Sequence, residues 1–85
     1  MDMMIVASPE AKFTIMVTKE TPRYDAKEVY RAHCFSYELI TKIWELTEQY
    51  KINTCSIYGP HTFIEYFAEK IEDKLDIKVK RIGVE

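Results

Sequence analysis

The first third of the chain carries short apolar and β-branched runs separated by polar residues. Residues 3–7 form an apolar run, and residues 13–18 (Phe-Thr-Ile-Met-Val-Thr) are rich in β-branched and aromatic side chains. The polar stretch between them, residues 8–12, contains Pro9 and is typical of a turn. The pattern predicts a hairpin, then a loop over residues 19–27 and a third strand over residues 29–35.

Apolar residues next recur at helical spacing in two segments. Ser36 is a suitable N-cap for a helix that runs to about Tyr50. In the second helix, Pro60 suits a first helical position, whereas Thr62 and Glu65 form a capping-box pattern that starts about two residues later. Each helix has one apolar face, formed by Leu39, Ile40, Ile43, Trp44, Thr47 and Tyr50 in the first and by Ile64, Phe67, Ala68, Ile71 and Leu75 in the second.

Two further strands complete the expected elements. The segment of residues 54–58 is short and carries no charge, as expected of a central strand. We expect residues 77–84 to form the last strand. The alternation of helix and strand after residue 36 predicts parallel pairing of the last strands through right-handed crossovers. We therefore expect residues 1–85 to form one small α/β or α+β domain, with a single mixed sheet and two helices.

This order, a three-stranded meander followed by helix, strand, helix and strand, resembles the ribonuclease H-like topology. The resemblance is one of element order. Nucleases of that class hold two metal ions with carboxylates from the first strand and from the strand after the first helix. Residues 3–7 and 54–58 contain no Asp or Glu. The resemblance thus implies a fold, and we do not expect a nuclease site.

Composition narrows the functional classes. The chain has 85 residues, of which 47% are hydrophobic, with 12 basic and 14 acidic residues for a net charge of −2. This balance disfavours a nucleic-acid binder, which is usually strongly basic. Two cysteines are too few for a disulfide scaffold, and the N-terminal apolar run is too short for a signal peptide or a membrane span. We expect a complete, cytoplasmic protein with reduced thiols.

Metal and nucleophilic chemistry is not expected from the Cys and His residues. His33 and Cys34 are neighbours on a predicted strand, so their side chains would point to opposite faces and could not share a metal ion. Cys55 and His61 flank a turn, but a mid-strand thiol is usually buried and inert. We predict no cofactor, no metal site and no catalytic residue.

The turn between the fourth strand and the second helix is the most distinctive local feature. It places Gly59, His61 and Thr62 where the carboxyl end of a strand meets a helix N-terminus, a place where open α/β sheets bind ligands and anions. The alternative is a tight structural turn capped by Thr62. A single glycine falls short of a phosphate-binding fingerprint.

Two clusters of charged residues can each be interpreted in two ways. Glu65, Glu69, Glu72 and Asp76 share one side of the second helix and would form either an acidic docking face or a solvated surface. Lys78, Lys80 and Arg81 would contact nucleic acid or simply keep a strand edge soluble.

Aromatic residues are abundant for so short a chain, with 4 Phe, 6 Tyr and 1 Trp. A domain of this size cannot bury all of them, and exposed aromatics are favoured at protein interfaces. Our candidates for exposure at an interface are Tyr37, Trp44, Phe63 and Tyr66. We therefore predict a non-catalytic protein-interaction or assembly module that forms a homodimer, as a small regulatory or accessory protein of the viral type would. The alternatives are a small-ligand or nucleotide-binding domain that uses the Gly59–Thr62 turn and a nucleic-acid-binding accessory protein.

Overall fold

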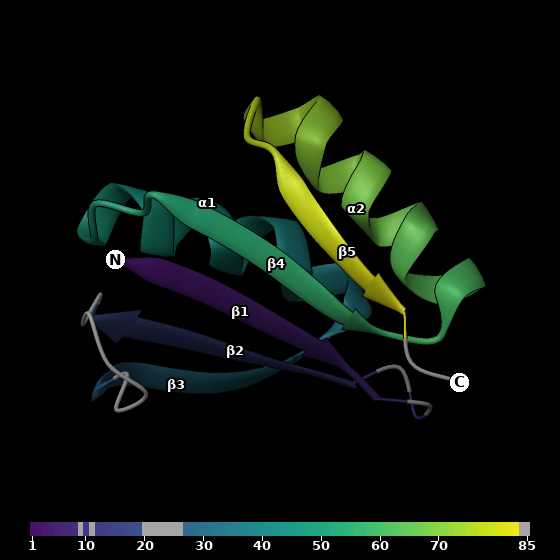
Figure 1. Ribbon diagram of the computed structural model, residues 1–85, viewed down its shortest axis with the longest axis horizontal. Coiled ribbons are helices and arrows are strands. Elements are labelled where there is room, and N and C mark those ends of the chain that lie inside the picture. The colour runs from purple at the N-terminus through teal and green to yellow at the C-terminus, as the bar shows by residue number, and fades with distance from the viewer. Residues whose placement is uncertain (9, 11, 20–26, 84–85) are drawn as a thin grey trace.

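The structure, a computed structural model, describes residues 1–8, 10, 12–19 and 27–83. Its elements follow the order expected from the sequence (Figure 1). They are β1 (Asp2–Ala7), β2 (Lys12–Lys19), β3 (Lys27–Phe35), a short 3₁₀-helix η1 (Ser36–Glu38), α1 (Leu39–Gln49), β4 (Thr54–Gly59), α2 (His61–Leu75) and β5 (Val79–Gly83).

The five strands form one mixed sheet in the order β3-β2-β1-β4-β5. β1 pairs antiparallel with β2, and β2 pairs antiparallel with β3, which gives the expected meander. β4 lies parallel to both β1 and β5, as the alternation of helix and strand predicted. The predicted fold, a single mixed sheet with two helices, is therefore confirmed.

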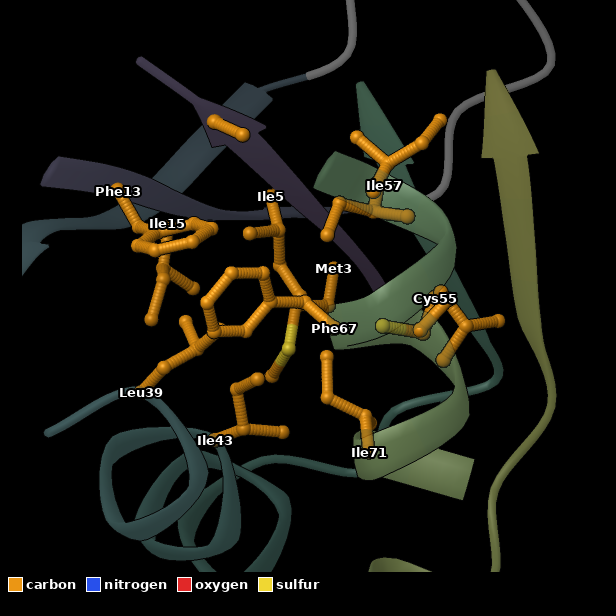
Figure 2. Packing of buried hydrophobic residues seen from close by; sticks show 14 of the residues in the cluster. Met3, Ile5, Phe13, Ile15, Leu39, Ile43, Cys55, Ile57, Phe67 and Ile71 are labelled. Atoms are coloured by element: carbon orange, nitrogen blue, oxygen red, sulfur yellow. The ribbon is translucent and has the colours of Figure 1, made fainter. Parts of the chain in front are cut away.

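Alternation along the strands determines which face of the sheet is buried. Ile5 lies opposite Ile15 on β2 and Ile57 on β4, and all three side chains are fully buried. Both helices pack on this face, as Figure 2 shows for Ile43 of α1 and Ile71 of α2, which join the same hydrophobic cluster. Burial of this apolar surface is the main force that holds the two layers together.

The opposite face of the sheet carries the alternate residues of each strand. Met4 pairs with Met16 and with Ser56, and all three are half-buried. Within the described residues, neither helix covers this face. The molecule is therefore a two-layer structure with one covered and one uncovered sheet face.

The helix starts differ from the sequence predictions. Ser36 begins η1 instead of capping α1, whose N-cap is Glu38 with no side-chain cap hydrogen bond. Thr62 lies inside α2, so its predicted capping role is wrong. The carbonyl of Pro60 accepts hydrogen bonds from the amides of Phe63 and Ile64, and Pro60 is therefore the N-cap. Its φ of −59° and ψ of 136° let the chain turn from strand to helix without a side-chain cap.

Several strand boundaries also differ. β3 begins at Lys27, two residues earlier than predicted, and β5 is limited to Val79–Gly83. Lys19 and Lys27 are strand ends instead of loop residues, and the rest of the predicted loop (20–26) lies outside the described residues, as do Pro9 of the predicted turn and Val84. None of the described helices is long and apolar enough to cross a membrane.

Candidate interaction surface

The turn predicted as a ligand site is shaped by packing. Gly59 is buried and has a φ of +155°, a conformation that side-chain-bearing residues rarely adopt. A Cβ at this position would lie 2.9 Å from both Ala7 Cβ and Ile64 Cγ2. Glycine is therefore required here so that β4 and α2 can pack closely.

His61 and Thr62 follow directly in the first turn of α2, and both are exposed. The His61 imidazole ring lies against Gly83 at the end of β5, because a Cβ added to Gly83 would overlap that ring. These contacts explain Gly59 and His61 by packing. They supply no observation that points to a bound anion.

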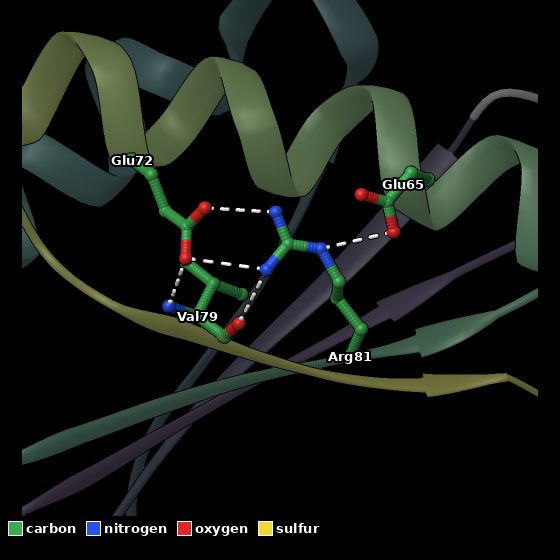
Figure 3. A network of polar contacts seen from close by, with 4 residues as sticks. All are labelled: Glu65, Glu72, Val79 and Arg81. Carbon is green, nitrogen blue, oxygen red and sulfur yellow. Dashed lines mark hydrogen bonds and ion pairs between the residues drawn. The ribbon is translucent and has the colours of Figure 1, made fainter.

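Arg81 links β5 to α2 through a bidentate ion pair with Glu72 (Figure 3). Its Nη2 lies 2.8 Å from Glu72 Oε1, and its Nη1 donates to Glu72 Oε2 at 3.2 Å and to the Val79 carbonyl at 3.1 Å. The Val79 amide donates to Glu72 Oε2 at 3.0 Å. The Arg81 Nε lies 3.0 Å from Glu65 Oε2, but this contact is an ion pair without hydrogen-bond geometry, since the buried Nε has no hydrogen-bond partner.

This network changes the interpretation of the acidic side of α2. Hydrogen bonds from Arg81, and then from the Val79 amide, lower the pKa of Glu72. Glu72 is half-buried, and Asp76 follows the end of α2 in the left-handed conformation with a φ of 52°. Two of the four acids, Glu65 and Glu72, thus bind within the molecule, and the four residues do not form one free stripe.

The predicted basic cluster is also divided. Lys80 pairs with Ser56 and Arg81 pairs with Ile57, so their side chains lie on opposite faces of the sheet. Arg81 faces α2, where it is neutralised by acids, while Lys78 and Lys80 are exposed. The three cations therefore do not converge into a surface for a phosphate backbone.

The Cys and His residues are separated as the sequence indicated. His33 Nδ1 lies 3.0 Å from Thr14 Oγ1 on the uncovered side of the sheet, whereas Cys34 is buried on the other side. Burial raises the pKa of the Cys55 thiol to about 12 and also raises that of Cys34, so both thiols are protonated at neutral pH. Among the described residues, no group of three or more His, Cys, Asp or Glu side chains could hold a metal ion.

Three of the four predicted aromatic residues are exposed. Tyr37, Trp44 and Tyr66 retain 80%, 53% and 57% of their accessible surface. The expected exposure of Phe63 is wrong, because its ring is half-buried and stacks on Phe13 at a centroid distance of 5.8 Å. Phe63 lies beside the buried face of α2 and therefore completes the core.

The structure adds Phe35, which the sequence analysis did not select. Phe35 is 46% exposed, and its ring stacks on Tyr37 with a centroid distance of 5.9 Å and an interplanar angle of 5°. Lys12 Nζ lies 5.7 Å from the centroid of the Phe35 ring. We call Lys12, Phe35 and Tyr37 the aromatic patch. The sequence does contain a signal for this exposure. Phe35 lies two and four residues after His33 and Arg31 on β3, so all three side chains lie on the same face of the sheet, and Arg31 and His33 are exposed.

The aromatic patch lies beside a shallow surface depression of about 260 Å³ where β3 passes into η1. Lys12, His33, Cys34, Phe35 and Glu38 line this depression. Its lining combines the Phe35 ring with charged groups of both signs. No protein-family model, no curated protein and no solved structure matches the chain.

Proposed function

We propose that the chain is a non-catalytic protein-interaction or assembly module that works as a homo-oligomer. The observation that supports this proposal best is the aromatic patch, in which two exposed rings stack on each other at the end of β3. Fully burying one large apolar side chain is worth about 1.5–3 kcal/mol, so the two rings together favour association substantially.

The rings of the aromatic patch contact each other within the chain. Phe35 stacks on Tyr37, and the Lys12 ammonium lies over the Phe35 ring. Ordering a flexible side chain on binding costs about 0.5–1.5 kcal/mol. Because stacking has restricted these rings in advance, more of the burial energy is available for affinity.

The two free thiols support the proposal that the protein acts in the cytoplasm as a small accessory or regulatory protein. Cys34 and Cys55 are unpaired and buried on the same sheet face, a state that persists in a reducing compartment. The alternatives identified from the sequence have less support. The Gly59–Thr62 turn is explained by packing, and Arg81 is neutralised by Glu72 and Glu65.

Sedimentation equilibrium over a range of about 1–200 μM tests the proposal, since weak homodimers dissociate in that range. We expect a reversible dimer, and we expect Tyr37→Lys to weaken it. Asp73→Lys is the control, because Asp73 is exposed on α2 and belongs to none of the candidate surfaces. A wild-type chain that stays monomeric over the whole range would contradict the homo-oligomer.

A further inference from the structure

The two edges of the sheet differ in how well they are protected. The β5 edge has five residues and carries Lys78 next to it and Lys80 within it, and such short, basic strands discourage pairing. The β3 edge has nine residues and no proline. Glu28 and Arg31 on β3 neutralise each other, with Arg31 Nε 2.6 Å from Glu28 Oε1.

The outer side of β3 offers backbone hydrogen-bonding groups to a further strand. β3 is the terminal strand of the sheet, so within the described residues its outer N–H and C=O groups have no strand partner. A bulge in the β2–β3 pairing leaves Val29 as the extra residue between Glu28 and Tyr30. The regular part of the edge therefore runs from Tyr30 to Phe35.

We propose that two copies of the chain pair their β3 edges antiparallel, about a two-fold axis at Ala32, to form one continuous ten-stranded sheet. This inference rests on the proposed homo-oligomeric function and assigns its interface. In this register each residue lies opposite one of the second copy, with Arg31 facing His33 and Tyr30 facing Cys34.

The distribution of exposed apolar residues along β3 selects this register. Val29 and Phe35 are the two exposed large hydrophobic residues of the strand, at 41% and 46%. They lie three residues on either side of Ala32. A two-fold axis at Ala32 therefore places Phe35 of each copy next to the Val29 bulge of the other, and contacts between aromatic and β-branched side chains stabilise antiparallel sheets.

Charge supports the same register. Lys12 pairs with Phe35 across the β2–β3 ladder, and its ammonium group lies over the Phe35 ring. Pairing about Ala32 brings this end of the edge next to Glu28 of the second copy. Glu28, which Arg31 of its own chain already contacts, then has Lys12 of the other copy as a second cation nearby.

A mixed cross-linking experiment tests the register. Arg31→Cys and His33→Cys are prepared as separate variants and oxidised mildly, alone and mixed. Directly opposite residues have Cβ atoms about 4.5–5.5 Å apart, while diagonal neighbours are about 7–8 Å apart and too distant for a disulfide. We expect a covalent dimer from the mixture, little from either variant alone and none from the wild type, whose two cysteines are buried.

Sedimentation equilibrium of surface variants tests the proposed β3 interface without cross-linking. Val29→Lys and Phe35→Lys should each raise the dissociation constant of the dimer by about tenfold or more, because each places a charge in the apolar pairs. Asp73→Lys should leave the dissociation constant unchanged. Far-ultraviolet circular dichroism confirms that each variant is folded.

The other outcomes separate this inference from the proposed function. A wild-type dimer with no cross-link in the mixture and no response to Val29→Lys or Phe35→Lys would overturn the β3 interface and leave the homo-oligomer standing. Equal cross-linking by the single variants would overturn the register. A monomeric chain whose β3 amides are protected from hydrogen exchange by a different protein would assign the edge to that protein and overturn pairing with a second copy.

Discussion

The guanidinium group of Arg81 and the carboxylate of Glu72 face each other with two contacts, at 2.8 Å and 3.2 Å. The carboxylate also accepts a hydrogen bond from the Val79 amide, so a single side chain of α2 binds β5 at two points. This arrangement fixes α2 against the outer strand of the sheet. Both groups are partly exposed, and salt screens such pairs.

The first prediction concerns acid stability. The pKa of Glu72 is lowered from its ordinary value of 4.5 by its hydrogen bonds. A group with a lowered pKa in the folded state contributes stability above its unfolded pKa, and this contribution is lost as the pH falls through the folded pKa. Glu72→Gln should therefore lower the free energy of unfolding at neutral pH, and the difference should vanish in acid. Urea unfolding over a pH series measures it.

Glu48→Gln provides the control for this series. Glu48 is exposed on α1, so the substitution makes the same chemical change without removing an Arg81 contact. Equal losses of stability in Glu72→Gln and Glu48→Gln at neutral pH would contradict the role assigned to the Arg81 pair.

The second prediction compares the two faces of the sheet. Ile57 is fully buried under the helices, whereas Ile82 is half-buried on the uncovered face. Ile57→Val should lower the free energy of unfolding by about 0.5–1.5 kcal/mol. Ile82→Val, the same substitution on the other face, should cost less than about 0.5 kcal/mol. Thermal or urea unfolding of both variants checks this, and a larger loss for Ile82→Val would contradict the arrangement of the layers.

The third prediction concerns the turn before α2. Gly59→Ala should destabilise the fold by about 1–3 kcal/mol, because alanine at a φ of +155° is strained and its Cβ would lie 2.9 Å from Ala7 Cβ. Gly83→Ala is the matched substitution, and it should cost less because only the exposed His61 ring has to move. Adding His61→Ala should recover stability in Gly83→Ala and not in Gly59→Ala. Recovery in both variants would be inconsistent with this explanation.

The fourth prediction concerns the thiols. Burial raises the pKa of Cys55 to about 12, so its thiolate is scarce near pH 8. A thiol-specific reagent should modify the native chain slowly and the urea-unfolded chain quickly. Cys34→Ala and Cys55→Ala separate the two rates, and we expect Cys55 to be the slower of the two. Rapid modification of Cys55 in the native chain would show that it is not buried as described.

Much of the fold could be predicted because it depends on local patterns. Alternation of Phe13, Ile15 and Val17 with polar residues at positions 14 and 18 indicates the buried face of β2, and these three residues are buried. The helical spacing of Leu39 and Ile43 likewise identifies the buried face of α1. Burial of alternate or helically spaced positions follows from backbone geometry alone, and a sequence reveals it directly.

The contacts of the candidate site could be predicted less well because they join distant parts of the chain. Nothing in the sequence indicates that Arg81 reaches Glu72, since the pairing depends on how closely β5 lies to α2. Phe63 was expected to be exposed because the chain has more aromatic residues than a small core can bury, yet it stacks on Phe13. Strand parity places Phe35 on the same face as Arg31 and His33, but its exposure also depends on β3 being the outer strand, and strand order is a property of the whole sheet.

The boundary between β1 and β4 divides the sheet into two parts. The meander β1-β2-β3 forms from neighbouring residues, and β4, α2 and β5 form a second local unit. In the described part of the chain, the parallel β1–β4 ladder is the strand pairing that joins them, and it pairs residues about 50 positions apart. Closing so long a loop is slow, so we expect this ladder to form late in folding, after the meander.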